Sequence, residues 1–142
     1  MKKKNTLLLF LCLFSLWAVA QEKKPVKIAC VGNSITYGSG IKNQFQNSYP
    51  GLLSQLLGEG YDVRNFGISA RVLLNKGDHP YMHEQKFRDL LAFQPDIVTI
   101  KLGTNDSKPW NWRYGKDFKK DLTEMLDILQ ELPSKPKIYL CL

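Results

Sequence analysis

Short apolar segments alternate along this chain with segments of helical periodicity, and this alternation limits the fold more than any other feature of the sequence. Four apolar segments predict strands, at 26–31, 61–66, 97–102 and 137–142. Between them, apolar side chains recur at helical spacing in three segments, at 49–57, 82–93 and 116–132. Strands that alternate with helices form right-handed βαβ units. The sequence therefore predicts an α/β fold with a parallel sheet covered by helices.

The first twenty residues have the three parts of a secretory signal peptide. Lysines at 2–4 precede an apolar segment at 7–19, and Ala18-Val19-Ala20 provides small residues for cleavage. We expect cleavage after Ala20 and a secreted or periplasmic protein. The apolar segment is shorter than the ~20 residues of a membrane span, so we expect no stable membrane insertion after cleavage. Residues 21–25 form a polar linker, and the domain follows from residue 26.

Charge and cysteine content exclude several classes of protein. Without residues 1–20, 17 basic residues stand against 13 acidic ones, and the net charge falls from +7 to +4. No stripe of basic and aromatic residues remains, so nucleic-acid binding is not predicted. Cys30 and Cys141 lie in predicted strands separated by a third strand, about 9–10 Å apart. This exceeds the ~7 Å that a disulfide allows, so we interpret both as buried thiols. Metal-ligand spacing is absent, and we expect no metal.

Three polar strings stand at the ends of the first three predicted strands. They are Gly32-Asn33-Ser34-Ile35-Thr36, Asn65-Phe66-Gly67-Ile68-Ser69 and Gly103-Thr104-Asn105-Asp106. The loops at the carboxyl ends of parallel strands converge on one crevice, so Ser34, Gly67 and Asn105 are expected to meet there. Each string alone has an ordinary structural alternative: a tight turn or phosphate cradle, a strand end, and a turn residue or helix cap.

Together these residues are the parts of a serine esterase. A serine hydroxyl is a weak nucleophile unless a base takes its proton, and the reaction needs donors aimed at the developing oxyanion. The backbone N–H groups of Ser34 and Gly67 and the side-chain amide of Asn105 supply three such donors. The first string is not the Gly-x-Ser-x-Gly turn of α/β-hydrolases, because Thr36 replaces the second glycine.

The three strings resemble, in order, the first three blocks of the SGNH/GDSL hydrolases. Within that family the chain resembles the secreted bacterial carbohydrate-esterase branch often labelled sialate O-acetylesterase-like, over about residues 27–142. The resemblance implies a flavodoxin-like, three-layer α/β/α fold and an esterase without a cofactor. It implies that Ser34 is the nucleophile and that Gly67 and Asn105 are oxyanion donors. Asn33 stands where the family commonly has aspartate, and both side chains can accept a hydrogen bond in that turn.

The fourth block of this family, Asp-x-x-His, supplies the base and the acid that orients it. No aspartate in these 142 residues has a histidine three residues later. His79 and His83 follow the second strand, on the wrong unit for a base, and we interpret them as surface or loop residues. We expect residues 26–142 to be the N-terminal part of an SGNH hydrolase domain, incomplete at the C-terminus. Residues 1–142 alone are expected to be inactive or nearly so.

Aromatic and basic residues after the third block suggest the substrate. Trp110, Trp112 and Arg113 are expected to line the crevice together with Asn33, where exposed rings would stack on sugars. The alternative is that one or both tryptophans cap the core beside the last helix. We therefore expect a secreted esterase that removes short acyl groups, acetyl foremost, from carbohydrate. The alternatives are a lipase or lysophospholipase of the same superfamily, a non-catalytic glycan-binding remnant, and a flavodoxin-like phosphate binder.

Overall fold

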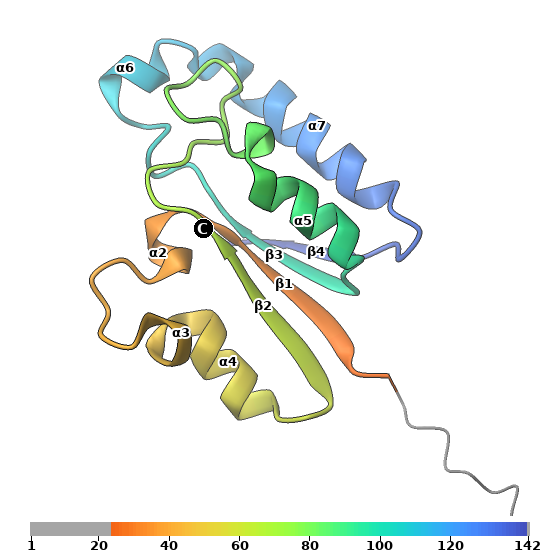
Figure 1. Ribbon diagram of the computed structural model, residues 1–142. Helices are drawn as coiled ribbons and strands as arrows, with labels where there is room; N and C mark the ends of the chain where they lie inside the picture. Colours follow the sequence, from red (N-terminus) through yellow and green to blue (C-terminus); the bar gives the residue numbers. More distant parts are fainter. Residues whose placement is uncertain (1–23, 142) are drawn as a thin grey trace, which may run out of the picture.

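Four parallel strands form the centre of the structure, a computed structural model that describes residues 24–141. The strands are β1 (Val26–Gly32), β2 (Tyr61–Gly67), β3 (Ile97–Lys101) and β4 (Lys137–Leu140). Their order is β2-β1-β3-β4, and every neighbouring pair is parallel. The predicted α/β fold is confirmed (Figure 1). The expected signal peptide and most of the expected linker lie outside the described residues.

Helices cover the sheet on both faces, as Figure 1 shows. One face carries α2 (Ser34–Tyr37), α3 (Gln44–Asn47) and α4 (Tyr49–Leu57), and the other carries α5 (Gln85–Phe93) and α7 (Phe118–Gln130). From β1 the chain passes to β2 at one edge and then crosses back over β1 to β3. The direction of winding therefore reverses between β1 and β3, and ligands of open α/β sheets bind at such a switch point.

The predicted helix 49–57 is confirmed with the same bounds, whereas two other helices are shorter than predicted. The helix predicted at 82–93 begins at Gln85, because Glu84 is extended (φ −80°, ψ 152°) and follows a short 3₁₀ helix, η2 (Tyr81–His83). The helix predicted at 116–132 is α7, which follows a second 3₁₀ helix, η3 (Gly115–Asp117). Segments expected to be loops hold α2, α3 and α6 (Pro109–Trp112). Four-residue helices are too short to show an amphipathic period.

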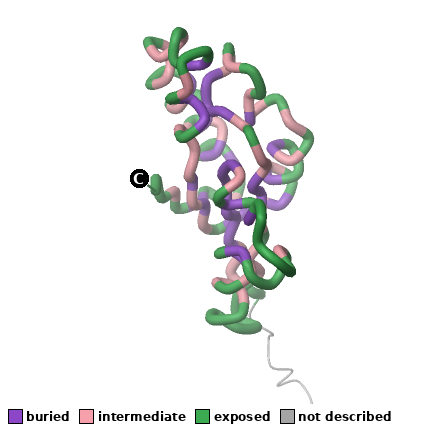
Figure 2. The backbone as a smooth tube through the Cα atoms, turned by 90° about the vertical axis from the view of Figure 1, so that its left-hand side faces the viewer, coloured by how far each residue is buried: buried purple, intermediate pink, exposed green. Residues whose placement is uncertain are grey.

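The main core lies between the sheet and the layer of α5 and α7. It is built from buried side chains of β1, β3, α5 and α7, among them Ala29, Val31, Val98, Ile100, Phe87, Leu90, Phe93, Met125 and Leu129. In Figure 2 the buried parts of the backbone gather in the interior, and the exposed parts lie mostly at the periphery. Tyr81 is fully buried, and its hydroxyl donates to the carbonyl of Phe66 at 2.7 Å. This bond fixes the end of β2 from the side opposite α2.

The opposite face of the sheet is covered less completely. Leu56 on α4 is 83% exposed, and Tyr139 on β4 is half exposed. The two cysteines differ in their exposure to solvent. Cys30 in β1 is a buried free thiol, as predicted, but Cys141 is exposed. The prediction for Cys141 is wrong for the described residues, in which β4 is the outermost strand and Cys141 follows its last residue.

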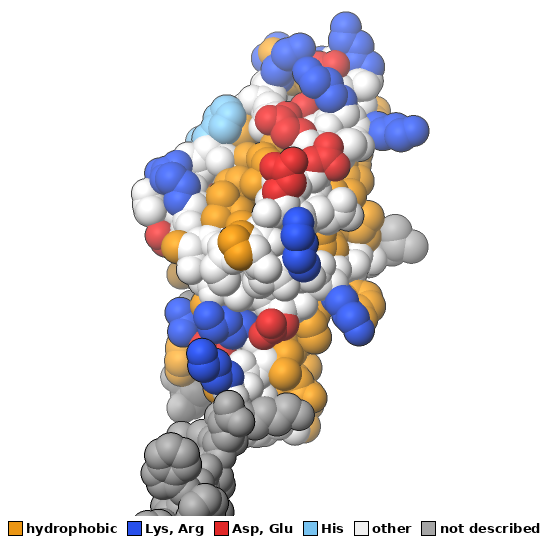
Figure 3. All heavy atoms as spheres, turned by 90° about the vertical axis from the view of Figure 1, so that its right-hand side faces the viewer, with side chains coloured by type: hydrophobic (Ala, Val, Ile, Leu, Met, Phe, Trp, Pro, Cys, Tyr) orange, Lys and Arg blue, Asp and Glu red, His pale blue; other side chains and the backbone are white. Residues whose placement is uncertain are grey.

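Charged side chains are mixed over the surface. On the face drawn in Figure 3, lysines and arginines lie in small groups with acidic side chains among them, and they form no continuous stripe. Among residues 24–141, no helix has the length and apolar content that a membrane span requires.

Candidate functional site

Ser34 lies at the carboxyl edge of the sheet, immediately after β1. It is the first residue of α2 and is half-buried. The side chain of Asn33 is 1% exposed, and its Oδ1 accepts the N–H of Ile35 at 3.1 Å, as expected for this turn. Gly38 ends α2 in the left-handed conformation (φ 88°), which glycine adopts without steric cost. The turn therefore presents Ser34 on a short helix with fixed ends.

Gly67 lies beside Ser34's helix at the end of β2. It pairs with Gly32 in the register of β1 and β2, and the N–H of Ile68 donates to the carbonyl of Gly32 at 3.0 Å. A Cβ atom on Gly67 would lie 2.3 Å from the backbone nitrogen of Tyr37, so only glycine fits. The N–H of Gly67 donates to Oδ1 of Asn65 at 2.9 Å. This predicted oxyanion donor is thus already engaged within its own turn.

Asn105 follows β3 and is held by the loop that follows β2. Its side chain is 8% exposed, and Nδ2 donates to the carbonyl of Arg71 at 3.0 Å. Nδ2 of Asn111 donates to the carbonyl of Asn105 at 3.0 Å. A carboxamide carries two N–H groups, and Arg71 accepts only one of them. The other N–H gives Asn105 the capacity to donate to a ligand in the crevice.

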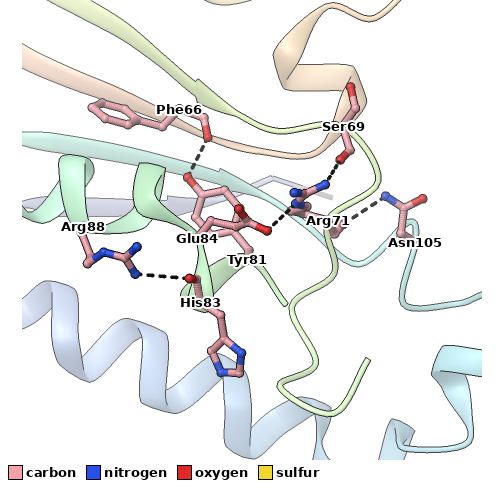
Figure 4. Close-up of polar contacts among 8 residues, drawn as sticks. All are labelled: Phe66, Ser69, Arg71, Tyr81, His83, Glu84, Arg88 and Asn105. Atoms are coloured by element: carbon pink, nitrogen blue, oxygen red, sulfur yellow. Dashed lines mark hydrogen bonds and ion pairs between the residues drawn. The ribbon is translucent and has the colours of Figure 1, made fainter. Parts of the chain in front are cut away.

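Arg71 connects this asparagine to the rest of the loop. Its Nη1 donates to the carbonyl of Ser69 at 3.0 Å, and its Nε pairs with the carboxylate of Glu84 at 2.8 Å. Figure 4 shows Arg71 between Ser69 and Asn105, so the ends of β2 and β3 are joined through one residue. No sequence pattern indicates a role for Arg71, because the partners of its side chain are one backbone carbonyl and a glutamate thirteen residues away.

Asp106 is a second residue whose role the sequence did not indicate. Its carboxylate is fully buried and accepts the N–H of Leu73 at 2.9 and 3.1 Å and the N–H of Leu74 at 2.8 Å. A buried carboxylate needs such donors to offset its lost hydration. Asp106 therefore fixes the loop of residues 68–80 against the turn that carries Asn105. The only sequence signal is its place beside Asn105 after an apolar strand.

The residues predicted to contact substrate after β3 lie on and just after α6: Trp110 and Trp112 are on the helix, and Arg113 follows it. Trp110 is 55% exposed and Trp112 is 53% exposed, and Arg113 is also exposed. Each tryptophan also has a contact within the protein. Nε1 of Trp110 donates to Asp78 at 3.1 Å, and the ring of Trp112 lies 6.0 Å from that of Phe118. Neither indole is part of the buried core, and each presents about half of its surface to solvent.

Burial and local hydrogen bonds shift several pKa values near the site. Burial lowers the pKa of Lys86, whose Nζ donates to the carbonyl of Gly67 at 3.3 Å, although Asp89 partly opposes the shift. Burial raises the pKa of the Cys30 thiol and also that of the Tyr49 phenol. Desolvation acts to raise the pKa of Asp78. Hydrogen bonds from Trp110 and Asn111 and the charge of His79 outweigh it, so that this pKa lies below its usual value.

His79 and His83 lie between β2 and α5, as the sequence predicts. Both His79 and His83 are exposed. Figure 4 shows the imidazole of His83 pointing away from Asn105, while its backbone carbonyl accepts a hydrogen bond from Arg88 at 3.2 Å. Within residues 24–141, no group of three or more His, Cys, Asp or Glu side chains is arranged to hold a metal ion.

The described residues thus contain the nucleophile and donor parts of the predicted site. Ser34 and Gly67 lie at adjacent strand ends, and Asn105 follows β3, the neighbour of β1 on its other side. Gly67 is the last residue of β2, whereas Ser34 and Asn105 follow β1 and β3, so all three lie near the carboxyl ends of the strands around the switch point. The assignment of catalytic roles to these three residues stays a prediction.

Comparisons with known proteins give a consistent family. A family model described as GDSL-like Lipase/Acylhydrolase matches residues 30–142. The chain is 48% identical over 139 residues to an acetylxylan esterase of Xylanibacter ruminicola, covering 86% of this chain and 29% of that protein. The chain thus spans less than a third of this curated relative.

Two solved structures show the same fold at low identity. One is AlinE4, an SGNH-hydrolase family esterase, with a TM-score of 0.60 at 23% identity over 82% of this chain and 58% of that one. The other is Est24, a carbohydrate acetylesterase from Sinorhizobium meliloti, with a TM-score of 0.63 at 21% identity over 81% of this chain and 62% of that one. At these identities the likeness establishes the SGNH fold.

Proposed function

Because this chain belongs to the GDSL-like lipase/acylhydrolase family, we propose that the full-length protein is a serine esterase that removes acetyl groups from carbohydrate. The observation that carries this proposal is the placement of Ser34, Gly67 and Asn105 near the carboxyl ends of β1, β2 and β3, at one edge of the sheet. The acetylxylan esterase relative supports acetylated polysaccharide as the substrate class.

In the proposed reaction, Oγ of Ser34 attacks the ester carbonyl carbon while a base takes the hydroxyl proton. The tetrahedral oxyanion accepts hydrogen bonds from the N–H of Ser34 and from the second N–H of Asn105. Collapse of this intermediate breaks the ester C–O bond, and the protonated base gives its proton to the departing sugar oxygen. Water then hydrolyses the acetyl-enzyme by the same steps and releases acetate.

Gly67 contributes a third donor to the oxyanion only if its N–H is shared between Asn65 and the oxyanion. That N–H already donates to Asn65 at 2.9 Å. A three-centre hydrogen bond allows one N–H to serve two acceptors. We propose that Gly67 turns part of its donation toward the oxyanion as negative charge develops, which makes this contact stronger in the transition state than in the ground state.

The base is proposed to lie outside these 142 residues. No aspartate in the sequence has a histidine three residues later, and the chain corresponds to 29% of the acetylxylan esterase. A histidine and an aspartate elsewhere in the protein would complete the triad. Without them, a serine hydrolase retains only the contribution of binding and oxyanion stabilisation, so residues 1–142 alone are expected to be inactive.

The half-exposed tryptophans of α6 support a carbohydrate substrate. Trp110 and Trp112 offer apolar ring surface for sugar faces, and Arg113 offers donors for hydroxyl groups. Asn33 is buried, so its proposed contribution to the substrate site acts through the turn that presents Ser34. The signal-like residues 1–20 support a secreted or periplasmic location.

A second candidate is a lipase or lysophospholipase. Ile35 and Tyr37, which follow Ser34 on α2, are exposed and would suit a longer acyl chain. The test is hydrolysis of acetylated xylan by the full-length protein, compared with esters of long-chain fatty acids. Release of acetate in preference to long-chain acids supports the acetylesterase, and the reverse preference supports the lipase. Binding of the acetylated xylan without turnover would identify the non-catalytic alternative.

A further inference from the structure

Asn65 joins the two strand ends that carry Ser34 and Gly67. It lies on β2 opposite Cys30 of β1, and its side chain is half-buried. Its Oδ1 accepts the N–H of Gly67 at 2.9 Å. On the other side of the carboxamide, Nδ2 donates to the backbone carbonyl of Thr36 at 3.0 Å and lies 3.3 Å from that of Tyr37. One side chain therefore contacts both Gly67 at the end of β2 and α2, the helix that begins with Ser34.

The two carbonyls that Asn65 contacts belong to the last turn of α2. Such carbonyls lack partners within a four-residue helix and need donors from elsewhere. Ser48, immediately before α4, adds a third contact, with Oγ 3.4 Å from Nδ2 of Asn65. The amide thus ties α2 both to β2 and to the start of α4. Because α2 begins with Ser34, this tie sets how the nucleophile lies relative to Gly67.

We propose that Asn65 is a positioning residue, which holds Ser34 and the N–H of Gly67 at the spacing that acyl transfer requires. This inference rests on the proposed esterase function and adds to it a residue that does not touch the substrate. A displacement of about 1 Å at a reacting group can cost about a hundredfold in rate. Loss of this amide is therefore expected to lower kcat while leaving KM, which reports substrate contacts elsewhere, largely unchanged.

Two variants of the full-length protein distinguish the acceptor and the donor of the Asn65 side chain. Asn65→Ala removes both the acceptor for Gly67 and the donor to α2. Asn65→Asp is nearly isosteric and keeps an acceptor for Gly67, but it lacks the donor for the carbonyls of Thr36 and Tyr37. The matched control is Asn47→Ala, which removes an amide that donates to the carbonyl of Lys42 at 2.7 Å in the same part of the chain.

The measurements are kcat and KM for p-nitrophenyl acetate, the rate of labelling by a fluorophosphonate, and the thermal unfolding midpoint. Both Asn65 variants are expected to lose at least tenfold in kcat and in labelling rate, with KM within about twofold of wild type, at temperatures where they are folded. Asn47→Ala is expected to keep kcat within about twofold. If Asn65→Ala does not fold, Asn65→Asp decides.

Three outcomes would overturn the proposal. If the wild type hydrolyses the ester and the folded Asn65 variants keep its kcat, the positioning role is wrong and the esterase function stands. If KM rises while kcat is unchanged, Asn65 contributes to substrate binding and not to positioning. If the wild-type protein neither hydrolyses esters nor reacts with the fluorophosphonate, the esterase function fails, and the positioning role fails with it.

Discussion

Gly67 and Tyr37 lie so close together that a methyl group on Gly67 would sit 2.3 Å from the backbone nitrogen of Tyr37. The same methyl group would lie 2.8 Å from the carbonyl carbon of Thr36. Neither neighbour is a flexible side chain, so the backbone of α2 would have to move. The position of α2, which begins with Ser34, therefore depends on the absence of a side chain at Gly67.

Replacement of Gly67 by alanine is expected to displace α2 and to lower kcat of the full-length protein at least tenfold. Misplacement of Ser34 relative to its oxyanion donors is the physical reason. Steady-state kinetics on an acetyl ester measures the effect. Gly60→Ala is the matched control, because a Cβ there would meet no atom within 4 Å. Equal activity of the two variants would show that α2 and β2 do not need this close contact.

Asn105→Ala is expected to lower kcat by about a hundredfold or more, which is typical for loss of one oxyanion donor. It also removes the hydrogen bond to the carbonyl of Arg71, so a loss of about 1 kcal/mol in unfolding free energy should accompany it. Kinetics and urea unfolding measure the two effects separately. Ser107→Ala, two residues away and exposed, serves as the control. A normal kcat in folded Asn105→Ala would remove Asn105 from the catalytic machinery.

Asp106→Asn is expected to destabilise the protein by about 1–3 kcal/mol, because the NH2 group that replaces one carboxylate oxygen cannot accept a hydrogen bond and would face the N–H of Leu73. The loop of residues 68–80 should become accessible to proteolysis before the rest of the domain. Asp127→Asn, on the exposed side of α7, is expected to be nearly neutral. If both substitutions cost the same in urea unfolding, Asp106 does not anchor this loop.

The contact between Asp78 and Trp110 is expected to weaken in acid. The pKa of Asp78 in the folded protein lies below its ordinary value of 3.8, since its hydrogen bonds and the charge of His79 outweigh desolvation. The stabilisation is therefore fully present above that ordinary value and is lost as the pH falls through the lower, folded pKa. Tryptophan fluorescence titrated from about pH 5 to about pH 2 should show this step, and Asp78→Asn should abolish it. The same titration curve in both proteins would contradict it.

The sequence predicts the strands and the order of the site strings well, because both depend on local patterns. Apolar segments that end at glycine mark β1, β2 and β3, and Ser34, Gly67 and Asn105 follow from the spacing of those ends. The sequence pattern predicts a start of α5 that is too early. Glu84 has an extended backbone and pairs with Arg71, thirteen residues away. No local pattern indicates such a pairing.

Long-range contacts account for the other differences. The roles of Asn65 and Asp106 depend on backbone groups 28 to 33 residues away, and isolated asparagine or aspartate residues do not reveal such partners. The exposure of Cys141 depends on the outer position of β4 among the described strands, which the apolar pattern of residues 137–142 does not indicate.

Acetate release from acetylated xylan is the decisive assay for the proposal that Ser34 is the nucleophile of an acetylesterase. The full-length protein and its Ser34→Ala variant are compared at equal concentration, with thermal unfolding as the control for folding. We expect that the wild type releases acetate and that the variant, with the same unfolding midpoint, loses more than about a thousandfold in kcat. Wild-type turnover in the folded Ser34→Ala protein would contradict it.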